Sequence, residues 1–138
     1  MNTIGQIKER LKNYAYAKYE SGDNYIRVLP LSKDTYSAEL ILEDDGCIVF
    51  FNGWHERFDK IEEGLDCFTF GLSTDCRLKE SRCREVAYRW TLEYKQGDEW
   101  VEDSTTALLI YPYFGKKEIK YLQSPLIDEK EQETRTDV

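Results

Sequence analysis

The single histidine of the chain, His55, is the first residue whose type could do chemistry, because imidazole ordinarily titrates near neutral pH. If its segment is helical, His55, Asp59 and Glu62 fall at positions i, i+4 and i+7 and share one face. An imidazole oriented by a carboxylate could then act as a general acid or base. The same spacing also fits the solvated face of an ordinary amphipathic helix.

A second candidate is an anion site at Arg89. The residue stands between Tyr88 and Trp90 in a segment of strict alternation, so its side chain points to the opposite face of a strand. Arginine can hold a carboxylate or phosphate with two parallel hydrogen bonds. We therefore predict Arg89, Tyr88, Trp90 and Trp54 as ligand-binding residues. The alternative is a cross-strand ion pair on a wet sheet face.

The cysteines do not form a metal-binding pattern. Cys47, Cys67, Cys76 and Cys83 contain no Cys-x-x-Cys pair, and one histidine cannot complete a zinc set of the usual spacing. We expect no metal and no cofactor. Cys76 and Cys83 flank a charged stretch and could meet across a hairpin.

Charge and hydropathy narrow the classes of partner. The net charge is −8, and residues 128–138 hold five acids and two bases. A chain this acidic repels a phosphate backbone, so we expect no nucleic-acid partner. No apolar run has the length of a membrane span or the form of a signal peptide, which predicts a cytoplasmic protein with reduced thiols and no membrane contact.

The elements that must position these residues begin with the strand at 84–94. Its large side chains alternate with polar ones over the whole segment. A strand that is wet on one side is typical of an antiparallel sheet.

The remaining elements follow from periodicity and turn residues. A helix is expected over 4–20, opened by a capping box of Thr3 and Gln6 and ended near Gly22. Segment 54–63 favours a short helix, although its alternation also fits a continued strand. Asp-Gly at 45–46 and the 96–98 turn predict hairpins, and 103–104 predicts a bulge. Further strands are expected at 24–29, 36–43, 47–52, 65–72, 100–101, 106–111 and 118–122, with the charged 79–82 stretch connecting two of them.

Together these elements predict an α+β fold. An N-terminal helix and a short second helix pack on a curved, mainly antiparallel sheet of about six to seven strands. Residues 1–126 form one domain, and 127–138 form an acidic, disordered tail.

The expected function is a non-catalytic binding or protein-interaction module. Its ligand is a small anion or a protein partner, and a homodimer formed through the sheet is the simplest version. One alternative is a small enzyme that uses His55 as acid or base, with Asp59, Glu62 or Asp66 orienting it. A further alternative is an acidic inhibitor of a basic partner.

Overall fold

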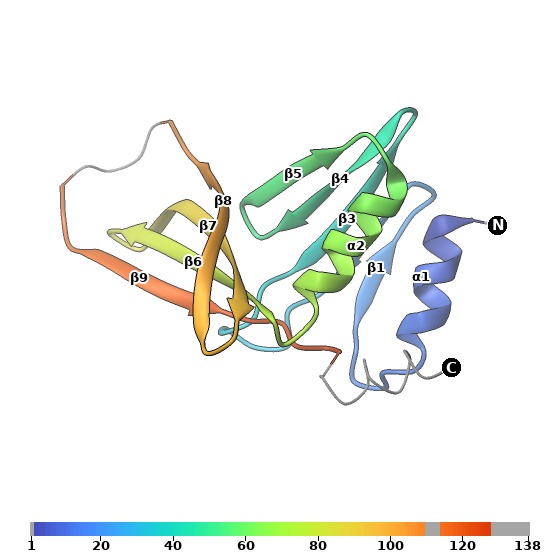
Figure 1. Cartoon of the computed structure of the whole chain (residues 1–138), viewed down its shortest axis with the longest axis horizontal. Helices are drawn as coiled ribbons and strands as arrows, with labels where there is room; N and C mark the ends of the chain where they lie inside the picture. Colours follow the sequence, from blue (N-terminus) through green and yellow to red (C-terminus); the bar gives the residue numbers. More distant parts are fainter. Residues whose placement is uncertain (1, 110–113, 128–138) are drawn as a thin grey trace.

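The computed structural model describes residues 2–109 and 114–127, which form two helices and two antiparallel sheets (Figure 1). The helices are α1 (Thr3–Leu11) and α2 (Ile61–Gly71). The first sheet contains β1 (Tyr19–Ser21), β2 (Tyr25–Val28), β3 (Ala38–Glu43), β4 (Gly46–Phe51) and β5 (Trp54–Phe58). The second contains β6 (Cys76–Cys83), β7 (Val86–Gln96), β8 (Glu99–Ala107) and β9 (Lys117–Leu122).

The first sheet is a meander in which each strand pairs with the next along the chain. Both helices lie on the same face of this sheet, as Figure 1 shows. The apolar side chains on that face, such as Ile26, Leu40 and Val49, are fully buried, and Ile4 and Phe68 of the helices belong to the same core.

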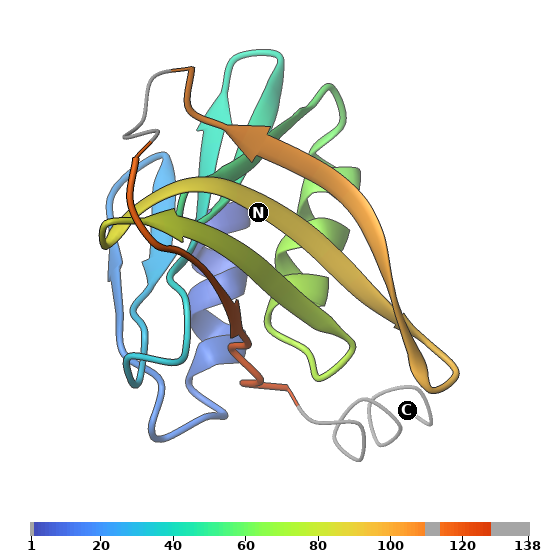
Figure 2. The ribbon, with the colours of Figure 1, turned by 90° about the vertical axis from the view of Figure 1, so that its left-hand side faces the viewer.

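The second sheet has the order β8-β7-β6-β9, so the chain leaves one edge at β8 and returns to the other edge at β9. Figure 2 shows its strands in front of the first sheet and the helices, with β7 and β8 strongly bent. The register of β7 with β8 shifts between Leu92 and Glu93, so that Asp103 is the extra residue. This is the bulge that the sequence predicts at 103–104.

The two sheets meet where β5 approaches β7 and β8. The Trp54 indole donates to the Ser104 hydroxyl at 3.1 Å, and Trp54 is only 1% exposed. Gly53 lies directly against the Trp90 ring, where any larger residue would overlap it. The apolar core therefore continues from one sheet into the other.

The α+β class is confirmed, but the prediction of one sheet is wrong, because the strands divide into two. The helix expected over 4–20 is also wrong in extent. Asn2 caps α1, its side chain accepting from the Ile4 amide at 3.0 Å. The helix ends at Leu11, and residues 19–21 pair with β2 instead.

The helix and strand assignments over 54–72 are interchanged. Segment 54–58 is strand β5, so the rival interpretation of its alternation was the right one. Residues 65–71 of the strand expected at 65–72 belong to helix α2, and Leu72 is the residue that follows its end. Gly64, Phe68 and Gly71 are buried at helical spacing in α2. The sequence predicted a strand here because residues 67–70 are of types that favour strands.

The charged stretch 79–82 is not a connection but the middle of β6. The turn follows it at Arg84 and Glu85, whose φ values of 53° and 66° are positive. Cys76 and Cys83 stand at opposite ends of β6, so the suggested pairing is wrong, and all four cysteines are free.

The hairpins around 44–46 and 96–98 and the expected strands at 24–29, 36–43, 47–52, 84–94 and 118–122 are confirmed within a few residues. Residues 110–111 of one expected strand and most of the expected tail lie outside the described residues. Of the helices that the structure describes, none is long and apolar enough to cross a membrane.

Candidate ligand pocket between the two helices

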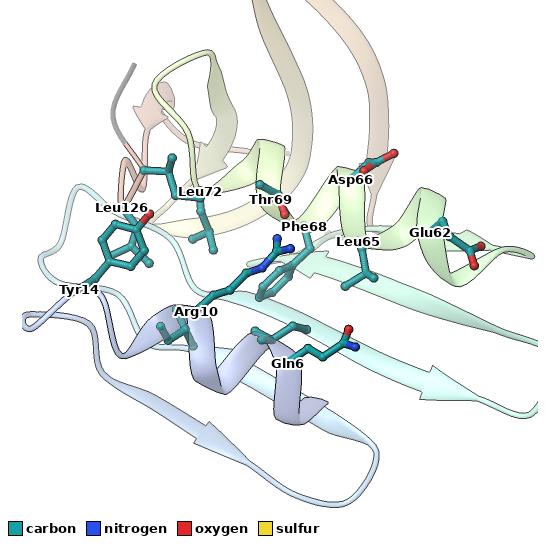
Figure 3. Close-up of a pocket in the computed structure, with 13 residues that line it drawn as sticks. Gln6, Arg10, Tyr14, Glu62, Leu65, Asp66, Phe68, Thr69, Leu72 and Leu126 are labelled. Atoms are coloured by element: carbon teal, nitrogen blue, oxygen red, sulfur yellow. The ribbon is translucent and has the colours of Figure 1, made fainter. Parts of the chain in front are cut away.

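Helix α2 is held against the first sheet by two glycines. A side chain at Gly64 would overlap the Cys47 sulfur, and one at Gly71 would overlap the Phe51 ring. The missing side chains let the helix backbone approach β4 closely. Another side of α2, which carries Leu65 and Thr69, turns toward α1 (Figure 3).

Helix α1 contributes its own apolar stripe to the opposite wall. Ile4, Ile7 and Leu11 are buried at positions i, i+3 and i+7. Arg10 and Gln6 flank this stripe and face the gap between the helices (Figure 3).

The end of the gap is closed by the C-terminal part of the described chain. The Ile127 amide donates to the Leu72 carbonyl at 2.8 Å, and the Tyr16 hydroxyl donates to the Leu126 carbonyl at 3.1 Å. Leu126 and Ile127 are both buried. Three segments distant in sequence thus converge around one space.

That space is a cavity of about 310 Å³ that is partly open to solvent. Figure 3 shows the side chains that line it. The volume lies at the lower end of the range for small-molecule sites, which runs from about 300 to 1,000 Å³. Its apolar walls are formed by Ile7, Leu11, Leu65, Phe68, Leu72 and Leu126.

Polar groups stand at the mouth of the cavity. The Arg10 guanidinium reaches across the opening toward Phe68 and Thr69 (Figure 3). It makes no ion pair or hydrogen bond with any residue in the described part of the chain. Glu62 and Asp66 lie on the α2 side of the cavity rim, and their carboxylates point away from the cavity interior (Figure 3). The site combines an apolar interior with a cation that has no ion pair within residues 2–109 and 114–127.

No family model matches the sequence, and no curated protein or solved structure matches the chain. The evidence for function is therefore the geometry of the molecule itself.

The structure does not place His55, Asp59 and Glu62 on one helix face. His55 belongs to β5, where its ring packs 5.3 Å from Phe50 on the sheet face away from the helices. Asp59 accepts from Arg57 at 2.6 Å, and Glu62 stands on α2 at the pocket rim. Of the predicted acid–base set, only Glu62 and the alternative carboxylate Asp66 line the cavity, and a role for His55 stays a prediction.

The predicted ligand-binding tryptophans are core residues. The Trp90 indole, 9% exposed, donates to the Glu80 carboxylate at 3.0 Å, just as Trp54 is bonded to Ser104. Arg89 is exposed on the outer face of the second sheet, between Ser81 and Ala107. Tyr88 is half-buried. These residues do not line the cavity between the helices.

The outer face of the second sheet contains a second cluster, centred on Arg77. Its guanidinium lies 4.6 Å from the Trp100 ring and 4.1 Å from the Tyr121 ring, and its Nε donates to Glu93 at 2.5 Å. Glu93 and the adjacent Thr91 are buried, so β7 is covered on both faces at this point rather than wet on one. Because the Arg77 guanidinium already contacts two rings and one carboxylate, we interpret the cluster as a stabilising contact between strands and not as a ligand site.

The thiols are poorly suited to nucleophilic chemistry. Burial raises the pKa values of Cys47 and Cys67 and raises that of Cys76 to about 12. Neutral thiols are weak nucleophiles. Within the described ranges, no group of three or more histidine, cysteine, aspartate or glutamate side chains could hold a metal ion.

Sequence reasoning missed Arg10, Gln6 and Thr69, because the pocket depends on where α1 ends and on the helical state of 61–71. One local signal was present. Arg10 directly precedes Leu11 and follows Ile7 by three positions, which places a cation beside an apolar helix stripe.

Proposed function

We propose that the protein is a non-catalytic module that binds a small molecule in the cavity between α1 and α2. The observation that carries this proposal is the apolar cavity of about 310 Å³ with Arg10 at its mouth, where Arg10 has no ion pair within the described part of the chain. Ligand sites commonly join apolar walls to a few polar groups that fix orientation.

The size of the cavity favours a ligand site as its explanation and argues against a defect in packing. Voids larger than a water molecule are few in protein interiors, which are packed as densely as organic crystals. The space corresponds to about ten water molecules at roughly 30 Å³ each. Its apolar walls offer few partners for such waters, so an apolar group would release them favourably.

The lining supports a binding role over a catalytic one. Among the described residues, the lining holds no histidine, cysteine or serine, and its carboxylates turn outward at the rim. No imidazole, the commonest general base, stands beside the Thr69 hydroxyl in this lining.

A titration with octan-1-ol, an uncharged amphipathic probe, tests the proposal. We expect saturable shifts of the methyl NMR signals of Ile7, Leu11 and Leu65, while Leu78 in the second sheet serves as an internal control. Thr69→Phe, which fills part of the cavity, should weaken these shifts. Shifts that do not saturate, or that spread evenly over both sheets, would count against the pocket.

A second candidate function, self-association, is favoured by exposed apolar side chains on strand β9 and in the segments that flank β8 and β9. Leu109 is 94% exposed, Phe114 79% and Ile119 56%. Such residues are typical of interfaces when they gather on one surface. Sedimentation velocity should show a dimer that Phe114→Ser weakens, and a strict monomer at all concentrations would exclude this version.

A further inference from the structure

We infer that the ligand of the cavity is an amphipathic monocarboxylate whose apolar part enters between the helices. This inference rests on the proposed function and names the chemical class that the same site would accept. The cavity interior and the charge pattern at its mouth carry the argument.

The cation at the mouth selects an anionic head group. Arg10 has no ion-pair partner among the residues placed by the structure, although Glu62 and Asp66 line the same cavity. Its side chain lies across the opening, so a head group there would meet the guanidinium directly (Figure 3). A guanidinium presents parallel N–H donors that match the two oxygens of a carboxylate.

The rim acids limit the charge of that head group to one. Glu62 and Asp66 stand on α2 near the mouth, so the three charged lining residues have a net charge of −1. A phosphate monoester carries nearly two negative charges at neutral pH and would be repelled more strongly than a carboxylate. A head group with one negative charge can contact Arg10 with less repulsion from the two rim acids than a doubly charged one.

Neutral donors can complete the contacts of a carboxylate. The side-chain amide of Gln6 and the hydroxyl of Thr69 both line the cavity, on opposite walls. An amide and a hydroxyl can each donate to a carboxylate oxygen. An ammonium head group would be repelled by Arg10 at this position and could be attracted only by Glu62 and Asp66 on the α2 rim.

The volume sets the length of the apolar part. Space for about ten water molecules accommodates a ligand of roughly ten non-hydrogen atoms, the size of octanoate. The wall residues Phe68 and Leu72 are aromatic or aliphatic, as an alkyl or phenylalkyl chain requires.

The test compares octanoate, octan-1-ol and octan-1-amine by the same methyl NMR titration. We expect octanoate to bind roughly tenfold more tightly than octan-1-ol, the effect of one partly exposed charge-assisted hydrogen-bonded pair. Arg10→Gln should remove this preference, so that octanoate and octan-1-ol bind the variant with similar affinity. Lys8→Gln is the matched control, since it removes one charge from the same helix at a residue outside the cavity lining and should leave the preference intact.

The outcomes separate the ligand class from the function. Equal affinities for octanoate and octan-1-ol, or tighter binding of octan-1-amine, would overturn the carboxylate while leaving a binding pocket. If none of the three probes binds, the proposed function fails as well. If octanoate binds only after residues 128–138 are removed, the chain itself competes for the site and the inference of a separate carboxylate ligand is overturned.

Discussion

Buried acidic side chains in the second sheet are each held by a donor from a neighbouring residue. Glu80 accepts from Arg82 at 2.6 Å and from the Trp90 indole at 3.0 Å. Glu93 accepts from Arg77, whose guanidinium contacts the rings of Trp100 and Tyr121. Removing one partner of such a pair leaves the other buried without compensation, which costs more than the intact pair contributes.

Replacement of Glu80 tests this directly. Glu80→Ala should lower the free energy of unfolding by about 2 to 3 kcal/mol, because the buried Trp90 N–H and the Arg82 guanidinium lose their acceptor. Urea denaturation measures the change. Glu118→Ala, at an exposed site on β9, is the control and should change stability by less than about 0.5 kcal/mol. Equal effects would mean that the carboxylate contributes only as surface charge.

Burial of the Cys76 thiol should make the free energy of unfolding decrease as the pH rises into the alkaline range. Burial raises the pKa of Cys76 from an ordinary value of 9.0 to about 12. Above pH 9 the unfolded chain releases this proton while the folded chain retains it, so the stabilisation present below pH 9 is lost as pH rises toward 12. Between pH 8 and pH 10 the loss amounts to about 1 kcal/mol for this one group.

Urea denaturation of the wild type and of Cys76→Ala at pH 8 and pH 10 isolates the effect. The wild type should lose about 1 kcal/mol more than the variant over this interval. The substitution also creates a cavity, but the destabilisation that this cavity causes is the same at both pH values. It therefore cancels when the two pH-dependent losses are compared. Identical losses would show that Cys76 does not titrate differently in the two states.

At the scale of elements, the position of α2 depends on close contact with the first sheet. Its sequence offers no side-chain cap at Lys60, and two of its buried positions are glycines. Contact with β4 therefore stabilises the helix more than its intrinsic propensity does. The contact also fixes the α2 wall of the cavity.

Glycine substitutions in the two helices should have opposite effects. Gly71→Ala should destabilise the protein by about 1 to 3 kcal/mol, because the added methyl group overlaps the buried Phe51 ring. Gly5→Ala in α1 meets only Asn2 at 3.7 Å and should stabilise by up to about 1 kcal/mol through helix propensity. Thermal unfolding compares the two variants. Similar shifts in both would show that α2 does not approach β4 so closely.

Sequence reasoning succeeded for elements determined by local chemistry and failed where tertiary contacts decide. The Gly97 turn and the Asp103 bulge were predictable, because turn and bulge residues act locally. Segment 54–72 was not, because its apolar residues satisfy both periods and only pairing with β4 selects strand for 54–58. The pocket was missed for the same reason, since Arg10 and Thr69 meet only after both helices pack.

At the scale of the molecule, charge is distributed unevenly. The turn between β3 and β4 carries Glu43, Asp44 and Asp45, while the turn between β6 and β7, at the opposite end in Figure 1, begins with Arg84. Lys116 lies beside that second turn, its carbonyl accepting from the Arg84 amide. Arg57 pairs with Glu43 and Asp45 at the acidic end, which offsets part of its negative charge. The expected inhibitor of a basic partner stays a prediction beside the pocket.

The two sheets share one core, and this predicts cooperative unfolding. The Trp54 indole of the first sheet is hydrogen-bonded to the Ser104 hydroxyl of the second. The Trp90 ring of the second sheet packs directly against Gly53, which has no side chain to prevent this contact. Because neither sheet can separate without exposing these rings, local opening of one should cost nearly as much as global unfolding. Native-state hydrogen exchange should give free energies within about 1 kcal/mol for the slowest amides of β3 and β7.

Substitutions at Trp54 and Ser104, where the two sheets meet, test this expectation more directly. Trp54→Phe removes the indole donor and part of the shared contact, so it should lower the exchange free energies of both strands together. Ser104→Ala, which removes only the acceptor, should act in the same direction with a smaller effect of about 1 kcal/mol. If the substitutions weaken β7 alone, the second sheet opens independently of the first. The pocket, whose walls apart from Leu126 and Ile127 come from α1, α2 and the residues that follow them, would then tolerate changes in the second sheet.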